Sequence, residues 1–122
     1  MKKKILIADD EPGFAESLGQ LFRIHGFDSV VVNDGERCLE AAVNEHPDLV
    51  LLDLVMPKIH GWEVAGRLCG NQATCDVPVI LLTASETYAK QACDLKNVAG
   101  RVLTKPFPFD ELLRIVRGLL LK

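Results

Sequence analysis

The sequence predicts a doubly wound α/β sandwich built on five parallel strands. Short apolar runs and segments with helical periodicity alternate along the chain five times. The apolar runs are continuous rather than alternating with polar residues, which is typical of parallel strands covered on both faces. Because crossovers between parallel strands are right-handed, the helices are expected to form a layer on each face of the sheet.

The predicted strands are apolar runs of four to six residues, four of them nearly free of charge. They lie at Lys4–Ala8, Ser29–Val32, Leu49–Leu52, Val77–Leu82 and Arg101–Thr104. In open parallel sheets, ligands bind beyond the carboxyl ends of the strands. The residues that follow each run are therefore the first candidates for a functional site.

Four of the segments between the strands carry a clear apolar stripe with helical spacing. The first begins after Pro12 and ends near Gly26, and the second has Asp34 as its N-cap candidate. The third opens after Gly61, and the last begins at Pro108. The stripes consist of Phe14, Leu18, Leu21 and Phe22; Leu39, Ala42 and Val43; Trp62, Val64, Ala65 and Leu68; and Phe109, Leu112, Leu113, Val116 and Leu120.

A further helix is predicted from Glu86 to Asn97, with a weaker stripe. Its apolar side consists mainly of Tyr88, Ala92 and Leu95, so we expect it to be loosely anchored. An element with few buried contacts is the one most free to move when a neighbouring site changes its charge.

Composition bounds the class of protein. With 122 residues, 48% of them hydrophobic and 25% charged, the chain has the size and make-up of one globular domain, expected to span residues 1–122. The net charge of −3 gives no reason to expect nucleic-acid or membrane binding. The basic start is followed by an apolar run that stops at Asp9, too early for a signal peptide. A cytoplasmic location is expected.

The cysteines and histidines do not form a metal-binding pattern. No two of the four cysteines form a C-x-x-C motif, and none stands at zinc-finger spacing from a histidine. The residues concerned are Cys38, Cys69, Cys75, Cys93, His25, His46 and His60. Zinc coordination is therefore disfavoured, and four reduced thiols are expected.

Polar residues of definite kinds follow four of the five strands. They are Asp9-Asp10 after the first, Asp53 after the third, Thr83-Ala84 after the fourth and Lys105-Pro106 after the fifth. Because the carboxyl ends of parallel strands meet at one edge of the sheet, three carboxylates, a hydroxyl and an ammonium are expected in one cleft.

Three carboxylates in one cleft favour the binding of a hard cation. Two carboxylates about 4 Å apart repel by on the order of 4 kcal/mol at an effective dielectric constant of about 20. One lysine cannot neutralise three carboxylates, and oxygen ligands with open positions suit Mg²⁺, which favours a phosphate partner. A carboxylate facing the metal could attack phosphorus, with Lys105 and Thr83 spreading the charge of the transferred group.

These residues resemble the signature of two-component response-regulator receiver domains. The resemblance rests on Asp9-Asp10, on the run from Asp53 to Pro57 with Gly61 beyond it, on Thr83-Ala84, and on Lys105-Pro106-Phe107, and it covers essentially the whole chain. It implies a flavodoxin-like (βα)5 fold with strand order 2-1-3-4-5. It also implies a signalling domain that catalyses only its own phosphorylation and dephosphorylation.

The resemblance implies a role for each site residue. Asp53 would be the phosphoacceptor. Mg²⁺ (or Mn²⁺) would be held directly by Asp10 and Asp53, mainly through water by Asp9, and by the backbone carbonyl of Val55. The phosphoryl oxygens would meet Thr83 and Lys105, Ala84 would leave room for them, and the bond to Pro106 would be cis.

Two further expectations concern tuning and output. Val55 and Ser85 stand where receivers tune dephosphorylation, and the branched, apolar Val55 is expected to hinder the attacking water. The aromatic residue that receivers usually carry three positions before the lysine is replaced by Val102, whose stiff χ1 leaves no ring to swing. The signal would then pass through the helix predicted at 86–97, the fifth strand and the last helix.

The resemblance also implies partners and leaves alternatives. The phosphodonor would be a histidine kinase or a histidine phosphotransfer protein, and the output a downstream partner or domain, with no direct nucleic-acid or membrane binding.

A haloacid-dehalogenase-like phosphatase would place its nucleophile in an Asp-x-Asp pattern on the first strand, where this chain has Asp9-Asp10-Glu11. A pseudo-receiver would lack phosphorylation, against which the intact Asp53, Thr83 and Lys105 argue. Glu11 is interpreted as a first-turn helix residue rather than a ligand.

Overall fold

The computed structural model describes residues 2–84 and 94–121. Outside the segment between the last two strands, strands and helices alternate as predicted, and the shift from expected to observed bounds is small. In chain order the elements are β1 (Lys4–Ala8), α1 (Pro12–Ile24), β2 (Asp28–Val32), α2 (Gly35–Glu45), β3 (Leu49–Asp53), α3 (Gly61–Gly70), β4 (Val79–Thr83), β5 (Val102–Thr104) and α5 (Phe109–Leu120).

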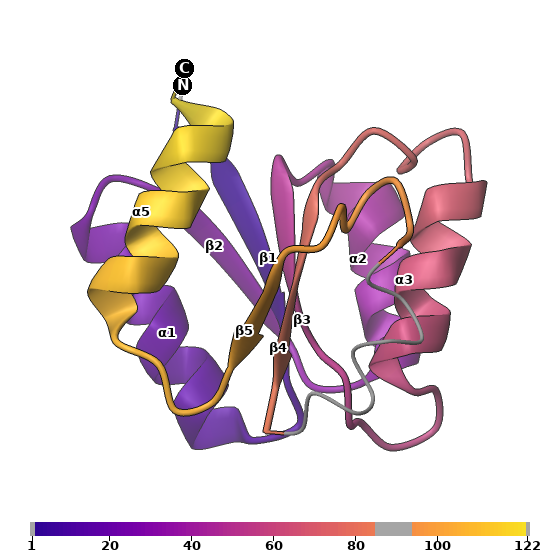
Figure 1. Ribbon diagram of the computed structural model, residues 1–122, viewed down its shortest axis with the longest axis horizontal. Coiled ribbons are helices and arrows are strands. Elements are labelled where there is room, and N and C mark those ends of the chain that lie inside the picture. Colours follow the sequence, from indigo (N-terminus) through magenta and orange to yellow (C-terminus); the bar gives the residue numbers. More distant parts are fainter. Residues whose placement is uncertain (1, 85–93, 122) are drawn as a thin grey trace.

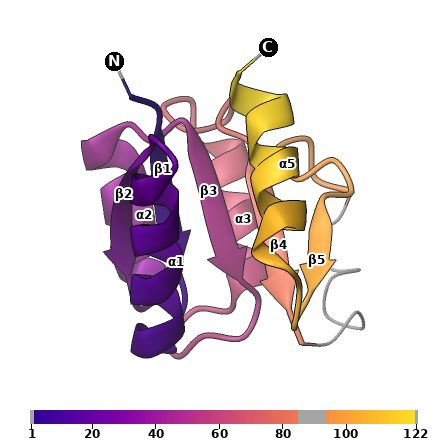
Figure 2. The ribbon, with the colours of Figure 1, turned by 90° about the vertical axis from the view of Figure 1, so that its left-hand side faces the viewer.

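The five strands form one parallel sheet in the order β2-β1-β3-β4-β5, which confirms the predicted topology. Helices α1 and α5 cover one face of the sheet, and α2 and α3 cover the other (Figure 1). The view turned by 90° shows α1 and α5 side by side in front of the sheet (Figure 2). Because the strands are parallel, their carboxyl ends all lie at one edge, which we call the carboxyl edge; the opposite end is the amino edge.

The core consists of two apolar layers, one on each face of the sheet. Alternate strand residues point to opposite faces, so Leu6 and Leu52 pack under α2 and α3, whereas Ile7 and Leu51 pack under α1 and α5. Every residue of β3 and β4 is buried, as their continuous apolar runs predict. Two members of the predicted helix stripes, Leu21 and Val43, are instead exposed, since they lie at the rim of their helix faces.

Local capping explains where α2 begins. The side chain of Asp34 accepts a hydrogen bond from the backbone N–H of Arg37 at 2.8 Å, which confirms Asp34 as the N-cap. No side-chain bond of this kind caps α1, α3 or α5 among the described residues. Those helices begin instead at Pro12, Gly61 and Phe109, the first of which has the proline favoured in a first turn.

The helix predicted at 86–97 falls mainly on residues 85–93, which lie outside the described residues, as do Ser85, Tyr88 and Cys93. Its predicted last turn is wrong, because residues 94–100 form turns. The carbonyl of Asn97 accepts the N–H of Val79 at 2.7 Å, and the Asn97 side chain donates to the Ala65 carbonyl at 3.1 Å. These bonds tie the segment to β4 and α3, and the positive φ of Ala99 (49°) excludes a continuing helix.

Three cysteines are described, and all are free: Cys38 is buried and Cys69 and Cys75 are partly buried. Burial raises the pKa of the Cys38 thiol to about 12, and the negative charge of Asp34 adds to the shift. In the part of the chain that the structure describes, no helix is both long enough and apolar enough to cross a membrane.

Candidate functional site

Three carboxylates meet at the carboxyl edge of the sheet. Asp9 and Asp10 follow β1, Asp53 ends β3, and one oxygen from each lies within 4.8 Å of the others. Asp9 is fully buried and Asp53 is 6% exposed, whereas Asp10 is exposed. Among the described residues, this trio is the group of acidic, cysteine or histidine side chains that could hold a metal ion.

Lys105 is the cation that faces these acids. Its Nζ donates to Asp9 Oδ2 at 2.8 Å and lies 3.6 Å from Asp53 Oδ2. Glu11 Oε1 stands at the same distance, 3.6 Å, so this residue contributes a further negative charge. The Lys105 side chain is 15% exposed, which makes these ion pairs stronger than surface pairs.

Backbone bonds fix the two buried acids. Asp9 Oδ1 accepts the N–H of Glu11 at 2.9 Å, while its carbonyl accepts from the Asn33 side chain at 3.0 Å. Asp53 Oδ1 accepts the N–H of Val55 at 3.2 Å. Each carboxylate therefore has one oxygen held by the main chain and a second oxygen turned toward Lys105.

Gly61 is required where α3 begins, because the helix meets the backbone of the site. Its N–H donates to the Leu54 carbonyl at 2.9 Å, which closes the loop after Asp53. A Cβ at this position would collide with the Asp53 carbonyl oxygen and lie 2.6 Å from the Leu54 Cα. Only glycine permits this approach, which explains why the sequence has Gly61 eight residues after Asp53.

The charges of the site shift the pKa values of its members. Burial raises the pKa of Asp53 from 3.8 to about 6, and Asp9 adds to this shift, while the Val55 N–H and Lys105 oppose it. Burial alone would lower the pKa of Lys105, yet this pKa is raised because its hydrogen bond to Asp9 and the charges of Asp53, Asp9 and Glu11 outweigh desolvation. The site as it stands carries more negative charge than it can neutralise.

A cavity of about 230 Å³ opens over these groups. It is lined by Asp10, Glu11, Asp53, Val55, Ala84 and Lys105. Val55 is 51% exposed and stands at the rim of this cavity. Thr83 is fully buried at the end of β4, directly before Ala84, and its carbonyl accepts the N–H of Lys105 at 2.7 Å.

The structure brings together most of the side chains that the sequence nominated. The carboxylates and the lysine lie in one site, Ala84 and Val55 line it, and the Lys105–Pro106 bond is cis. Val102 pairs with Leu81 in the sheet, is half-buried and packs on the apolar layer under α2 and α3.

Two site residues were missed by the sequence reasoning. Glu11 is the N-cap of α1 rather than a first-turn residue, and it lines the cavity beside Lys105. Phe14, taken as a core residue, places its ring under the Lys105 ammonium, with Nζ 4.4 Å from the ring centroid. Their position directly after Asp9-Asp10 was the one available signal, because the first turn of a helix that starts at a site faces that site.

The sequence matches the response regulator receiver domain family over residues 5–117. The chain belongs to this family. Two relatives are the DNA-binding response regulator MtrA of Mycolicibacterium smegmatis, 38% identical over 97% of this chain, and the DNA-binding dual master transcriptional regulator RpaA of Synechocystis, 37% identical over 96%. The alignments cover 50% of MtrA and 48% of RpaA, so this receiver domain spans about half the length of these relatives.

Solved structures of receiver domains have the same fold. The response regulator TrrA of Thermotoga maritima, solved in complex with Mg²⁺ and BeF, is 37% identical and superposes with a TM-score of 0.83, covering 97% of this chain and 99% of TrrA. The receiver domain of a Francisella response regulator is 30% identical, with a TM-score of 0.83 over 97% of this chain and 96% of its own. This receiver domain is therefore a signalling domain of two-component systems.

Proposed function

We propose that this receiver domain accepts a phosphoryl group on Asp53 in a reaction that depends on Mg²⁺. The observation that carries the proposal is the cluster of three carboxylates beside Lys105, which pairs with Asp9 and Asp53, while Asp53 also lines an open cavity. Asp53 is the member of the trio that is both nearly buried and open to that cavity, so a phosphodonor can reach a carboxylate held in a fixed position.

The acids at the carboxyl edge fit a hard divalent cation. Their oxygens lie within 4.8 Å of one another, Asp10 offers an exposed carboxylate at the cavity, and oxygen donors are those that Mg²⁺ prefers. Asp10 and Asp53 would hold the ion directly, with the Val55 carbonyl, and Asp9 mainly through water; Mn²⁺ would suit the same donors. When bound, the ion supplies positive charge to the phosphoryl oxygens.

In the transfer step, the free carboxylate oxygen of Asp53 forms a bond to phosphorus. The bond between phosphorus and the donor breaks at the same time, and its electron pair stays on the donor, a histidine nitrogen of a kinase or phosphotransfer protein. Lys105 gives up its ion pair with Asp53 and donates to a phosphoryl oxygen. Thr83 turns its hydroxyl to the same group, for which the small Ala84 leaves space.

The exposed Val55 at the cavity rim is positioned to slow the loss of the phosphoryl group. Hydrolysis needs a water molecule in line with the bond between Asp53 and phosphorus, and an apolar branched side chain neither orients nor donates to such a water. Ser85, the second tuning position, lies outside the described residues. The domain would thus catalyse its own phosphorylation and dephosphorylation, and residues at the rim of the cavity would set the rate of dephosphorylation.

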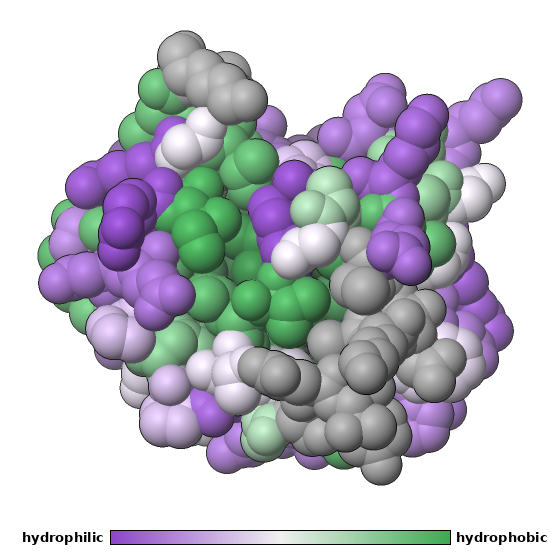
Figure 3. Space-filling model, in the orientation of Figure 1, coloured by the Kyte–Doolittle hydropathy of each residue, from purple (hydrophilic) through white to green (hydrophobic). Residues whose placement is uncertain are grey.

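The output would pass through the face that carries β5 and α5. Apolar side chains gather on this face between the two elements (Figure 3), and Val102, Ile115 and Leu119 are partly rather than fully buried. A dianion on Asp53 would draw in Thr83 and Lys105, and the segment after Thr83 would follow while Val102 keeps one rotamer. A downstream partner or an output domain would recognise this change; the relatives MtrA and RpaA are named as DNA-binding regulators. We place the domain in the cytoplasm, where its phosphodonor and output would meet it.

The phosphatase alternative has no support in the geometry. It requires a nucleophile on the first strand, but Asp9 is fully buried and both of its oxygens are engaged, one by Lys105 and one by the Glu11 N–H. A pseudo-receiver without phosphorylation would have no need of this converging set of charges.

The test is phosphorylation by acetyl phosphate, followed by intact mass, with and without Mg²⁺. Wild-type protein should gain one phosphoryl group only with the metal, and Asp53→Asn should gain none because an amide is not the same nucleophile. Asp10→Ala should lose Mg²⁺ affinity in a calorimetric titration while staying folded without metal. Metal-independent labelling, labelling of Asp53→Asn, or unchanged Mg²⁺ affinity in Asp10→Ala would each contradict the proposal.

A further inference from the structure

Among the described residues, the Lys105 ammonium also contacts an aromatic ring, not only carboxylates. Its ammonium lies over the ring of Phe14, with Nζ 4.4 Å from the ring centroid. Phe14 is half-buried in the first turn of α1, and its ring packs edge-on against Phe107, with centroids 6.2 Å apart and ring planes at 83°. Since Phe107 follows Lys105 by two residues, the aromatic pair connects α1 to the loop that carries the lysine.

Carboxylates provide the ion pairs that hold this ammonium. Lysine is a point charge on a flexible four-carbon stem, and its shortest contact here is the 2.8 Å bond to Asp9. A divalent cation on the acids would compete for the same negative charge and weaken that bond. The Phe14 ring attracts the ammonium through its quadrupole, and this attraction does not depend on any of the acids.

We propose that Phe14 is a positioning residue for Lys105. Its ring keeps the ammonium at the mouth of the site while Lys105 exchanges carboxylate oxygens for phosphoryl oxygens. The kinetic part of this inference rests on the proposed phosphorylation of Asp53; the contact between Phe14 and Lys105 does not. A partly exposed cation–π contact corresponds to about a two- to fivefold change in the phosphorylation rate.

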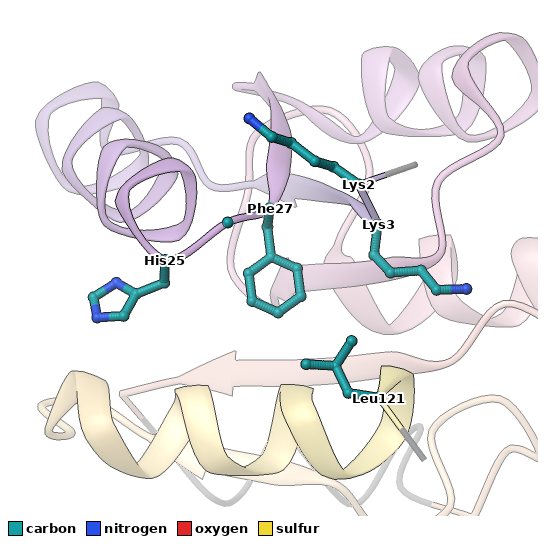
Figure 4. Close-up of a pocket in the computed structure, with 6 residues that line it drawn as sticks. Lys2, Lys3, His25, Phe27 and Leu121 are labelled. Carbon is teal, nitrogen blue, oxygen red and sulfur yellow. The ribbon is translucent and has the colours of Figure 1, made fainter.

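Matched variants separate this role from packing. Phe14→Leu keeps an apolar side chain but removes the ring, and Phe14→Tyr restores a ring. The control is Phe27→Leu, because Phe27 is 3% exposed and packs edge-on against Phe22 in the same apolar layer, with centroids 5.8 Å apart. Phe27 directly precedes β2 at the amino edge, where it lies between α1 and α5 (Figure 4), and it does not line the cavity that contains Lys105.

The first readout is the NMR shift of the Lys105 ε-methylene protons in unphosphorylated protein. We expect these protons to be shifted upfield by the ring in wild type, Phe14→Tyr and Phe27→Leu, and to return to ordinary values in Phe14→Leu. The second readout is the rate of phosphorylation by acetyl phosphate, which should fall about two- to fivefold in Phe14→Leu alone.

Three results would overturn the inference. The first is an ordinary NMR shift of the Lys105 ε-methylene protons in the wild-type protein. This measurement needs no variant, so it tests the contact even if Phe14→Leu fails to fold. The other two concern the rate of phosphorylation. The second is an equal loss of rate in Phe14→Tyr and Phe14→Leu, and the third is an equal loss in Phe27→Leu. If the wild-type protein takes up no phosphoryl group, the proposed function is wrong and so is the kinetic role of Phe14. An upfield shift of the Lys105 protons in the same protein would still confirm the contact between Phe14 and Lys105.

Discussion

Each edge of the sheet holds a cavity, and the two cavities differ in the charge of the side chains that line them. At the amino edge a cavity of about 430 Å³ is lined by Lys2, Lys3, His25, Gly26, Phe27 and Leu121 (Figure 4). At the carboxyl edge the cavity is smaller, about 230 Å³, but Lys105 and the acids converge in it. The amino-edge lining, as far as the structure describes the chain, contains no carboxylate.

The difference teaches that converging charged side chains, rather than cavity size, distinguish the edge at which we place phosphorylation. Lys2 and Lys3 are exposed and solvated, so their charges cost the fold little. At the carboxyl edge the pKa of Asp53 is raised to about 6 by burial and by Asp9, so ionisation of this side chain costs the fold stability. Variants at the two edges should therefore have unequal effects.

The largest effect is expected for Gly61→Ala at the carboxyl edge. The Cβ of the new alanine would collide with the Asp53 carbonyl oxygen, so the start of α3 must shift. We expect this shift to lower the free energy of unfolding by about 3 kcal/mol. The control is Gly66→Ala in the same helix, where a Cβ meets nothing within 4 Å, and which should stabilise by about 0.5–1 kcal/mol. Urea unfolding measures both, and equal effects of the two substitutions would show that the contact with Asp53 is not close.

Asp53→Asn should have the next largest effect, with the opposite sign. The folded pKa of Asp53 is raised from 3.8 to about 6, so its ionisation destabilises the metal-free fold as pH rises through this range. The variant should be more stable by about 2 kcal/mol at about pH 8 in the presence of a chelator. Below about pH 3, where the carboxyl is largely protonated in both states, the gain should vanish. A pH-independent difference in urea unfolding would contradict this origin.

Gly26→Ala probes the amino edge. Gly26 has φ of +93°, a conformation that costs a residue with a Cβ about 1 kcal/mol, although nothing lies within 4 Å of that Cβ. We expect this loss of stability with no change in the rate of phosphorylation or in Mg²⁺ affinity. Altered metal binding in Gly26→Ala would mean that the two edges are coupled.

The smallest effect on stability is expected for Val55→Asn. Val55 is 51% exposed, and surface substitutions of this kind change stability by less than about 0.5 kcal/mol. The phosphoryl lifetime should nevertheless shorten, because an amide can orient the water that the branched side chain hinders. The decay of the phosphorylated mass over time measures it, and an unchanged or longer lifetime would remove Val55 from the tuning role.

The sequence predicted the interior and the charged site because both follow from simple patterns. Continuous apolar runs of four to six residues are typical of strands covered on both faces, and the residues after parallel strands share one edge. Asp53 and Lys105 are 52 positions apart in the chain, yet the topology alone brings their side chains to 3.6 Å. The buried state of β3 and β4 follows in the same way.

The features that the sequence did not predict depend on how α1 is oriented about its axis and on hydrogen bonds between residues far apart in the chain. Whether Glu11 precedes α1 or belongs to its first turn decides whether it faces Lys105, and one position separates the two cases. Phe14 has the spacing of a core residue, so its contact with Lys105 emerges only when α1 and the loop after β5 are placed together. The turns at residues 94–100 are imposed by the bonds of Asn97 to β4 and α3, which no local propensity encodes.

The most direct test of the account is to locate the phosphoryl group chemically. Borohydride reduces an aspartyl phosphate to homoserine, so protein treated with acetyl phosphate and Mg²⁺ and then with borohydride can be mapped by peptide mass spectrometry. We predict homoserine at position 53 and unmodified aspartate at Asp9 and Asp10, with no conversion when Mg²⁺ is withheld. Homoserine at Asp9 or Asp10, or a phosphoryl group that resists borohydride on another residue, would contradict the assignment of Asp53 as the phosphoacceptor.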